Sequence, residues 1–298
     1  MHIPDGFLAT PVWAAFDVIS LPAVGWIARQ TRTSPGESRT PLLGILGAFV
    51  FAAQMINFPI APGTSAHLLG GALLAATVGP FAAIIVLTAV LAIQALVFQD
   101  GGLLAFGANV FNIAIAGSLA GYAPIALFRG QWQRVGLFLG GLISVLLSGS
   151  CALAQLVLSS VTMPQQLLGG ALILFVVNGL IEGVITVVVV EAIARLSPAR
   201  VQPGRPSAGL VALGITAVLL AGTGFVFASA APDSLETIAN KAGISARETQ
   251  LLATPFAGYE WQGIPVQAFA KSSAGLAGAG LVFFCIAGVS RLLRRRSA

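Results

Sequence analysis

Only two histidines occur among the 298 residues, and one of them is the second residue of the chain. The Met1 amine, the His2 amide nitrogen and a His2 ring nitrogen can close fused five- and six-membered chelate rings around a metal ion. These are three nitrogen donors in one plane, and the imidazole of His67 would complete a square. Four nitrogens in a tetragonal arrangement suit Ni(II) or Cu(II), and Co(II) less diagnostically. The alternative is that His2 is an accident of a disordered terminus.

Chelation by Met1 requires a free amino terminus. No basic leader, apolar run or small-residue cleavage site precedes the Pro4-Asp5-Gly6 turn, so we expect no signal peptide to be removed. A second residue as large as His2 is also expected to block removal of the initiator methionine. Both expectations leave the Met1 amine available as a donor.

The composition predicts the class of protein. Hydrophobic residues make up 57% of the chain and charged residues 8%, and the mean hydropathy is +0.93. A soluble domain carries about 25% charged residues, and several apolar runs here approach the ~20 residues that span a bilayer core. We therefore expect an all-α polytopic protein of the plasma (inner) membrane, with the lipid bilayer as a partner and no nucleic acid.

The number of spans depends on the apolar stretch 68–98. As one helix it would be about 46 Å long, too long for a core of ~30 Å without strong tilt. Gly79-Pro80 is the expected break, which gives two segments, the first of them short. Together with these two, nine spans are expected, the others at 12–28, 42–56, 103–128, 135–158, 168–195, 210–228 and 272–290.

The distribution of positive charge predicts the orientation. If the N-terminus is outside, all but three of the 15 basic residues lie in inner loops, the exceptions being Lys241, Arg247 and Lys271. The positive-inside rule therefore favours N-out and C-in. This orientation places His2, His67 and the polar connection 57–66 on the outer face, where an incoming ion arrives.

Two stretches carry a family resemblance. Residues 1–8 (MHIPDGFL) and 59–71 (PIAPGTSAHLLGG) resemble the CbiM/NikM family, the substrate-binding membrane components of energy-coupling-factor (ECF) cobalt and nickel transporters. The resemblance covers about residues 1–195 and implies a seven-helix module into which the N-terminal segment plugs back. It also implies that the metal is held by Met1, His2 and His67, the donors that chelate geometry suggests.

The remainder resembles the two-helix companion subunit of that family, CbiN, or a PDGLE domain. The matching stretches are 231–236 (APDSLE) and 254–260 (TPFAGYE), with Ser234 where the usual motif has glycine, which leaves the turn geometry open. We expect a metal-binding transport module over 1–206 and a two-helix domain over 207–298, with an outer polar loop at 229–271. The loop offers no soft or imidazole ligand, so no metal is expected in it. Docking onto the first module is its favoured role, and a solvated loop is the alternative.

The source of energy bears on the function. The sequence has no G-x-x-x-x-G-K-[ST] loop to bind ATP phosphates, and the resemblance implies a transmembrane coupling protein and cytoplasmic ATPases as partners. We expect a substrate-capturing component that takes up Ni²⁺ or Co²⁺ from the outside for ATP-driven import. It is not expected to be an enzyme or to hold a prosthetic group. The metal would supply nickel enzymes or cobalamin biosynthesis, and the planar donors and the Pro4-Asp5 opening favour nickel slightly.

Two other classes of protein are weighed against this one. A stand-alone metal/proton transporter needs several intramembrane carboxylates, and Glu182 is almost alone. An intramembrane metalloenzyme needs an open coordination position and a general base, and the chain has no H-E-x-x-H. Glu182 is expected to make a helix-packing hydrogen bond, with a step in the ion path as the alternative. Asn109 and Asn112 pose the same choice, and a structural role is favoured for both.

Overall fold

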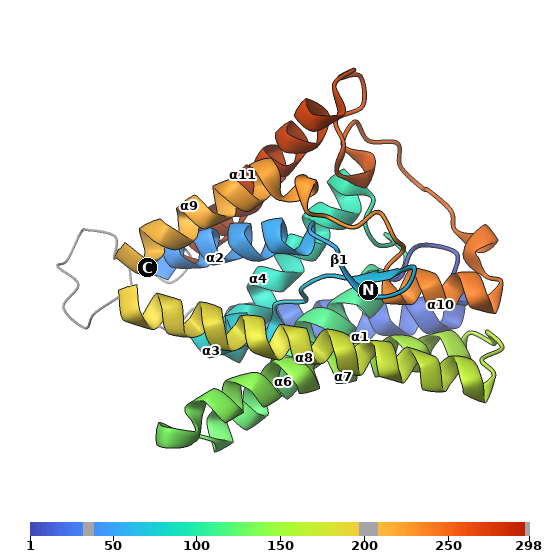
Figure 1. Cartoon of the computed structure of the whole chain (residues 1–298). Coiled ribbons are helices and arrows are strands. Elements are labelled where there is room, and N and C mark those ends of the chain that lie inside the picture. The colour runs from blue at the N-terminus through green and yellow to red at the C-terminus, as the bar shows by residue number, and fades with distance from the viewer. Residues whose placement is uncertain (32–38, 197–207, 296–298) are drawn as a thin grey trace.

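The computed structural model describes residues 1–31, 39–196 and 208–295. Most of this is helical (Figure 1). The helices are α1 (Thr10–Gln30), α2 (Arg39–Gln54), α3 (Gly71–Val78), α4 (Pro80–Ile93), α5 (Phe106–Asn109), α6 (Gly117–Leu127), α7 (Gln133–Leu158), α8 (Gln165–Leu196), α9 (Ala208–Thr223), α10 (Ser234–Ala242) and α11 (Gln267–Arg295). Two π-helical stretches, Gln94–Phe98 and Val110–Ala116, continue α4 and join α5 to α6. A small antiparallel hairpin, β1 (Phe58–Ala61) and β2 (Thr64–Ala66), precedes His67.

The predicted class, an all-α polytopic membrane protein, is confirmed. Within the described ranges, 7 helical stretches are long and apolar enough to cross a bilayer. All nine expected segments form helices, but the count of full spans is corrected, because α2 has 16 residues and α3 only 8. At 1.5 Å per residue α3 covers only about 12 Å, so it cannot cross a core of ~30 Å alone.

The break at Gly79-Pro80 is confirmed. Helix α3 ends at Val78, Gly79 has φ 86°, and α4 begins at Pro80. Glycine tolerates this φ without steric cost, and proline suits the first position of a helix because its missing N–H has no intrahelical acceptor there. Gly79-Pro80 therefore separates the short α3 from the longer α4.

The outer helices expose the apolar side chains expected to face lipid. On α1, Val18 is 73% and Trp26 58% exposed, and this helix is long and apolar enough to cross a bilayer. Arg32, Arg200, Arg205 and Arg296, part of the basis for the predicted orientation, lie outside the described residues. The N-out, C-in orientation therefore remains a prediction.

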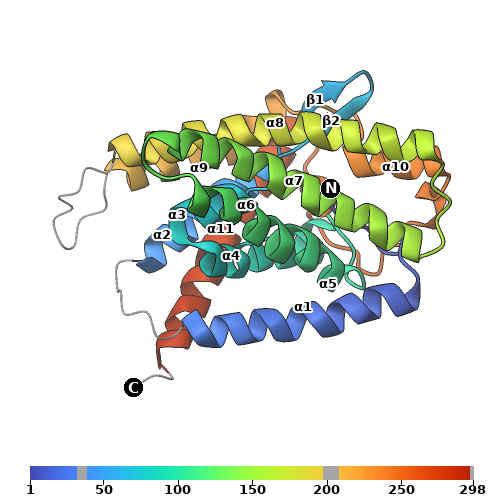
Figure 2. The ribbon, with the colours of Figure 1, turned by 90° about the horizontal axis from the view of Figure 1, so that it is seen from below.

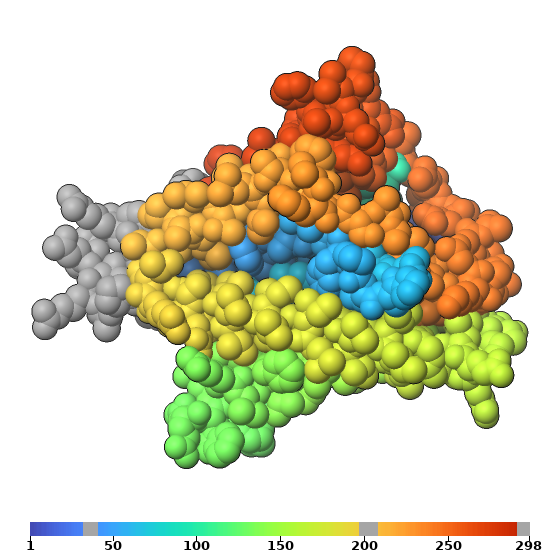
Figure 3. Space-filling model, viewed as in Figure 1, coloured from blue at the N-terminus to red at the C-terminus, as the bar shows by residue number. Residues whose placement is uncertain are grey.

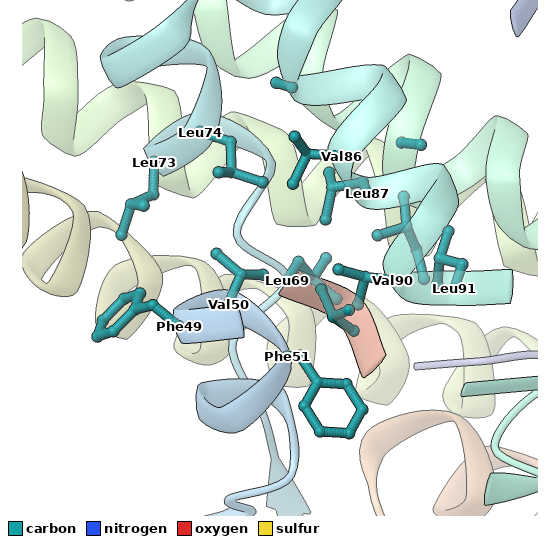
Figure 4. Close-up of a cluster of buried hydrophobic side chains, with 14 of the residues drawn as sticks. Phe49, Val50, Phe51, Leu69, Leu73, Leu74, Val86, Leu87, Val90 and Leu91 are labelled. Atoms are coloured by element: carbon teal, nitrogen blue, oxygen red, sulfur yellow. The ribbon is translucent and has the colours of Figure 1, made fainter. Parts of the chain in front are cut away.

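The core centres on the junction of α2, α3 and α4. Figure 4 shows Val50 of α2 beside Leu69, with Val86, Leu87 and Val90 of α4 nearby, and all of these side chains are buried. Inside a bilayer such contacts stabilise through close packing, because lipid tails are as apolar as the side chains themselves. Leu69 follows His67 by two residues, so this core also anchors the His67 segment.

Other helices pack on two sides of this core. Helices α6, α7 and α8 lie on one side, and α9 and α11 lie on the other, where they pack against α2 (Figures 1 and 2). Between α7 and α8, a Cβ atom on Gly141 would lie 2.6 Å from the Cα of Gly183. Glycines thus allow these two backbones to approach closely. The hairpin lies between α8 and the C-terminal segment that leads into α10 (Figure 3).

Candidate metal site

The N-terminal segment is inserted into the helical bundle. Met1, His2 and Ile3 are buried, in agreement with the plug that the resemblance implied. Asn109 binds both polar groups of Ile3, since its Oδ1 accepts from Ile3 N at 2.8 Å and its Nδ2 donates to Ile3 O at 2.9 Å. The amide of Gly102 donates to the same carbonyl at 2.8 Å. Because these bonds fix Ile3, they also fix where Met1 and His2 lie.

The Pro4-Asp5-Gly6 turn fixes the C-terminal end of the plug, residues 1–3. The Asp5 carboxylate accepts hydrogen bonds from the backbone N–H groups of Leu103, Leu104 and Ala105 at 2.8 to 3.1 Å. Gly6 has φ 92°, and a Cβ atom there would lie 1.8 Å from the carbonyl oxygen of Arg247. The motif therefore needs aspartate to bind the loop before α5, and it needs glycine because a side chain there would collide with the C-terminal segment.

His67 lies between β2 and α3, on a segment held by α8. Glu182 accepts hydrogen bonds from Leu69 N at 2.8 Å and Gly70 N at 2.7 Å, and Asn178 Nδ2 lies 3.5 Å from His67 O. The carboxylate also faces the N-terminus of α3, where the helix dipole favours negative charge. The hydrogen-bonding role favoured for Glu182 is confirmed, but its partner is the backbone of the His67 segment.

The His67 ring presents Nε2 to the site. Its Nδ1 lies 2.9 Å from Leu68 O, so the proton is assigned to Nδ1 and the lone pair to Nε2. Nε2 contacts the Met1 amine. Burial, together with the positive Met1 terminus, lowers the pKa of His67 below its usual value. The ring is therefore neutral at neutral pH, which is the form that binds metals.

His2 lies beside His67, and its ring nitrogens differ. The two rings are stacked with centroids 5.2 Å apart and an interplanar angle of 4°. A six-membered chelate ring from the His2 amide must close through Nδ1, which lies 3.0 Å from Asp100 Oδ1. Chelation through Nδ1 therefore replaces its contact with Asp100. Among the described residues, no hydrogen-bond partner is found for the buried Nε2.

Two carboxylates that the sequence did not point to flank these donors. Asp100 accepts from the Tyr259 hydroxyl as well as from His2. Burial alone would raise the pKa of Asp100, but His2 and Tyr259 lower it below the usual value. Asp233 contacts the Met1 amine. Burial would raise its pKa too, and the Met1 terminus and His67 hold it low instead. Both side chains are therefore ionised at neutral pH.

The structure thus brings together Met1, His2 and His67, the residues proposed from sequence. It also places Asp233, which belongs to the loop 229–271 in which no metal was expected, beside the Met1 amine. The aspartate of the APDSLE stretch could have been considered as a ligand from the sequence. Its proximity to Met1 could not be predicted, because the two residues are far apart along the chain. Within the described ranges, no group of three or more His, Cys, Asp or Glu side chains is arranged to hold a metal ion. A site here consequently needs main-chain nitrogens.

Asn109 and Asn112, which the sequence treated alike, have different roles. Asn112 exchanges two hydrogen bonds of 2.8 Å with Gln155 of α7, so its structural role is confirmed. Asn109 instead binds the plug, and its position influences the donors directly. Ser234 is the first residue of α10 and has no positive φ, so glycine is not required at that place in the motif.

Comparisons with known proteins identify the family. The family model described as "Cobalt uptake substrate-specific transmembrane region" (CbiM) matches residues 2–200, and the PDGLE domain model matches residues 207–295. A putative metal transport protein of Haloquadratum walsbyi is 42% identical over 207 residues, which cover 66% of this chain and 92% of that protein. A putative fused nickel transport protein, NikMN, of Archaeoglobus fulgidus is 37% identical, with 74% of each chain covered.

The fold also resembles that of a solved structure. A crystal structure described as a truncated transition metal transporter aligns with a TM-score of 0.50 and 31% sequence identity. The alignment covers 65% of this chain and 99% of that one. The helical arrangement is thus shared with a protein described as a transporter of transition metals.

Proposed function

Because the chain belongs to the CbiM family of transition-metal transport proteins, with a PDGLE domain following in the same chain, we propose that it is the substrate-capturing component of an ECF-type importer. Its cargo is a divalent ion, Ni²⁺ or Co²⁺, taken from the outer side of the inner membrane. The proposed domains are a metal-binding transport module over 1–206 and a two-helix domain over 207–298. The end of the first family match at residue 200 and the start of the second at 207 support this boundary.

The proposed metal donors are the Met1 amine, the His2 amide and Nδ1, and His67 Nε2. The observation that carries this assignment is the contact between the buried Met1 amine and His67 Nε2. An amine and a neutral imidazole side by side away from water are well suited to bind a metal ion. Binding must displace protons from the amine and the amide, so the affinity is expected to rise with pH.

Energy for import is proposed to come from partner subunits, a transmembrane coupling protein and cytoplasmic ATPases. The absence of a phosphate-binding loop from the sequence supports this division of labour. The rival, a stand-alone metal/proton transporter, would need carboxylates free to carry protons. Glu182 is instead bound to two backbone amides, which argues against a relay through it.

Nickel is the favoured cargo. Relatives from Archaeoglobus fulgidus and Rhodobacter capsulatus are described as fused nickel transport proteins, and this chain has the same fused arrangement. Cobalt is the second candidate, since a relative from Acetoanaerobium sticklandii, 35% identical over 162 residues, is described as a cobalt transport protein. The imported metal would supply nickel enzymes in the first case and cobalamin biosynthesis in the second.

The first test concerns the terminal amine. Extra residues placed before Met1 convert the amine into a peptide nitrogen, whereas a tag after Ala298 leaves all donors intact. We expect titration calorimetry with NiCl₂ in detergent to show one bound ion per C-tagged chain and no high-affinity binding to the N-tagged chain. Equal affinities would show that the amine is not a ligand.

The second test concerns the energy source. The chain is expressed with candidate coupling and ATPase subunits, and separately with an ATPase whose phosphate-binding lysine has been replaced. We expect accumulation of radioactive nickel only with the active ATPase. Equal accumulation by the chain alone would favour the stand-alone transporter.

A further inference from the structure

Asp233 reaches the proposed metal site from the C-terminal domain. The residue is buried, and its Oδ2 contacts the Met1 amine and lies 3.6 Å from His67 Nε2. It is thus next to two of the proposed donors, although 232 positions separate it from Met1 in sequence.

The two carboxylate oxygens of Asp233 have separate partners. Oδ1 accepts from Glu236 N at 2.9 Å, and Glu236 Oε2 accepts from Asp233 N at 2.8 Å, which forms a capping box at the start of α10. The cap uses Oδ1 and fixes the side-chain orientation. Oδ2 is left to face Met1 and His67.

The backbone that carries Asp233 is attached to the hairpin that leads to His67. Ser65 N donates to Pro232 O at 2.8 Å, and Ser65 Oγ donates to Ala231 O at 2.7 Å. One helical turn into α10, Thr237 Oγ1 lies 3.3 Å from Thr64 Oγ1. Residues on both sides of Asp233 are therefore tied to the chain two to three positions before His67, which fixes the carboxylate relative to the imidazole. Figure 3 shows this C-terminal segment lying against the hairpin.

Coordination geometry makes Oδ2 a suitable donor. Two ligand atoms at about 2 Å from one metal ion, and at right angles to each other, are separated by roughly 3 Å. Oδ2 contacts the Met1 nitrogen and lies 3.6 Å from His67 Nε2, so all three atoms are close enough to bind one ion after small shifts.

Charge favours the same role. A divalent ion bound by a neutral amine, a deprotonated amide and two neutral imidazoles retains one positive charge. A buried charge is costly unless it is paired, and a carboxylate in direct contact provides the pairing. Resting on the proposed function, we propose that Asp233 Oδ2 is an oxygen ligand of the transported ion, so that the C-terminal domain completes the site.

The proposal is tested with Asp233→Asn in the full chain. Asparagine caps a helix as well as aspartate does, so α10 keeps its start while the anionic oxygen is lost. We expect calorimetry with NiCl₂ to show affinity lower by on the order of 10-fold or more. We also expect the visible absorption of the loaded protein to differ between the two chains, because losing an oxygen ligand changes the ligand field of the ion.

Two further variants serve as matched controls. Asp233→Ser keeps a capping oxygen but is too short to reach the amine, so it should behave like Asp233→Asn. Glu236→Gln changes the other half of the capping box and should leave the spectrum of the loaded ion unchanged. Size-exclusion chromatography establishes that each variant is folded before loading. If one of the two Asp233 variants does not fold, the other still tests the proposal.

The outcomes separate this inference from the proposed function. If His67→Ala abolishes nickel binding while both Asp233 variants keep the wild-type spectrum, Asp233 is not a ligand and only this inference fails, whatever the change in affinity. If His67→Ala binds nickel as tightly as the wild type, the proposed site itself is wrong.

Discussion

Two polar segments meet at the site, and they are held in very different ways. The first, 57–70, carries His67 and is bound by side chains of the surrounding helices, among them Glu182 and Gln54, whose Nε2 donates to Leu69 O at 2.8 Å. The second, 229–266, brings Asp233 and Tyr259 to the site and is itself bound to the hairpin through Ser65. Beyond α10 it includes an exposed stretch, in which Leu251 and Leu252 are about half exposed. The first segment is therefore held by buried hydrogen bonds near His67, whereas part of the second lies at the surface.

This contrast predicts different local stability. Buried hydrogen-bond networks whose members are all paired are rigid, whereas segments with few buried contacts open at low free energy. We expect the amides of Leu69 and Gly70 to exchange with solvent far more slowly than those of Gln250 to Leu252. Hydrogen exchange read by mass spectrometry checks this, and similar rates would remove the contrast.

The largest effect is expected from His67→Ala. The change removes the second imidazole and should weaken nickel binding beyond the roughly 10- to 100-fold typical of losing a supporting residue. Equilibrium dialysis measures the affinity, and the melting temperature in detergent should stay close to that of the wild type. Near-wild-type affinity would mean that the ligand set is wrong.

Glu182→Gln should have the next largest effect, because it removes a hydrogen bond that holds the backbone just after His67. Glutamine has one acceptor oxygen for two N–H groups, and its own NH₂ would face one of them, so a buried donor loses its partner. We expect nickel affinity to fall by about 10- to 100-fold, with no change in the spectrum of the loaded ion.

Glu191→Gln, further along the same helix, is the control for that experiment. Glu191 pairs with Arg134 and Arg195 at the exposed end of α8, and such exposed pairs contribute little. Its replacement should leave affinity unchanged. Equal effects of the two changes would indicate a general loss of α8 stability instead of a role for Glu182 in positioning His67.

A smaller effect is expected from Asn109→Ala, which releases Ile3 while the donors remain in the chain. We expect affinity to fall by roughly 10-fold, the lower end of the range for supporting residues. Asn112→Ala is the matched change in the adjoining π-helical stretch, where the partner is Gln155. It should lower the melting temperature without changing affinity, and calorimetry on both variants distinguishes the two roles.

Sequence reasoning predicted the parts of this molecule that depend on local chemistry. The helices follow from long apolar runs, the break at Gly79 from backbone sterics, and the pairing of the His2 chelate with His67 from the shortage of histidines. It counted the short segment α3 as a full span, because the distribution of positive charges required a crossing there. The structure gives α3 only 8 residues. It also missed the hairpin and α10, which lie in polar stretches with little periodicity.

The contacts of Asp100 and Asp233 could not be predicted for a different reason. Each aspartate has an ordinary local setting, a turn after a span and a helix cap. Their role near the donors arises only when residues 1–3 fold back against segments near positions 67, 100 and 233. Such long-range proximity leaves no mark on spacing within one sequence.

The smallest effect, and the one that best sharpens the contrast, is expected from Tyr259→Phe. Phenylalanine keeps the ring that stacks on Phe98 at 4.8 Å but loses the hydroxyl that donates to Asp100. Burial raises the pKa of Asp100, and His2 and Tyr259 together lower it, so without the hydroxyl this pKa rises. Because His2 still faces the carboxylate, Asp100 stays ionised at neutral pH. Asp100 must release His2 Nδ1 before that nitrogen can bind the metal, so the hydroxyl acts on the metal-free site, and its loss should change nickel affinity by only a few-fold, roughly the value of one hydrogen bond. Nickel titration calorimetry on both chains at neutral pH measures this, and a loss of about 10-fold or more would mean that Tyr259 supports the donors through more than its hydrogen bond to Asp100.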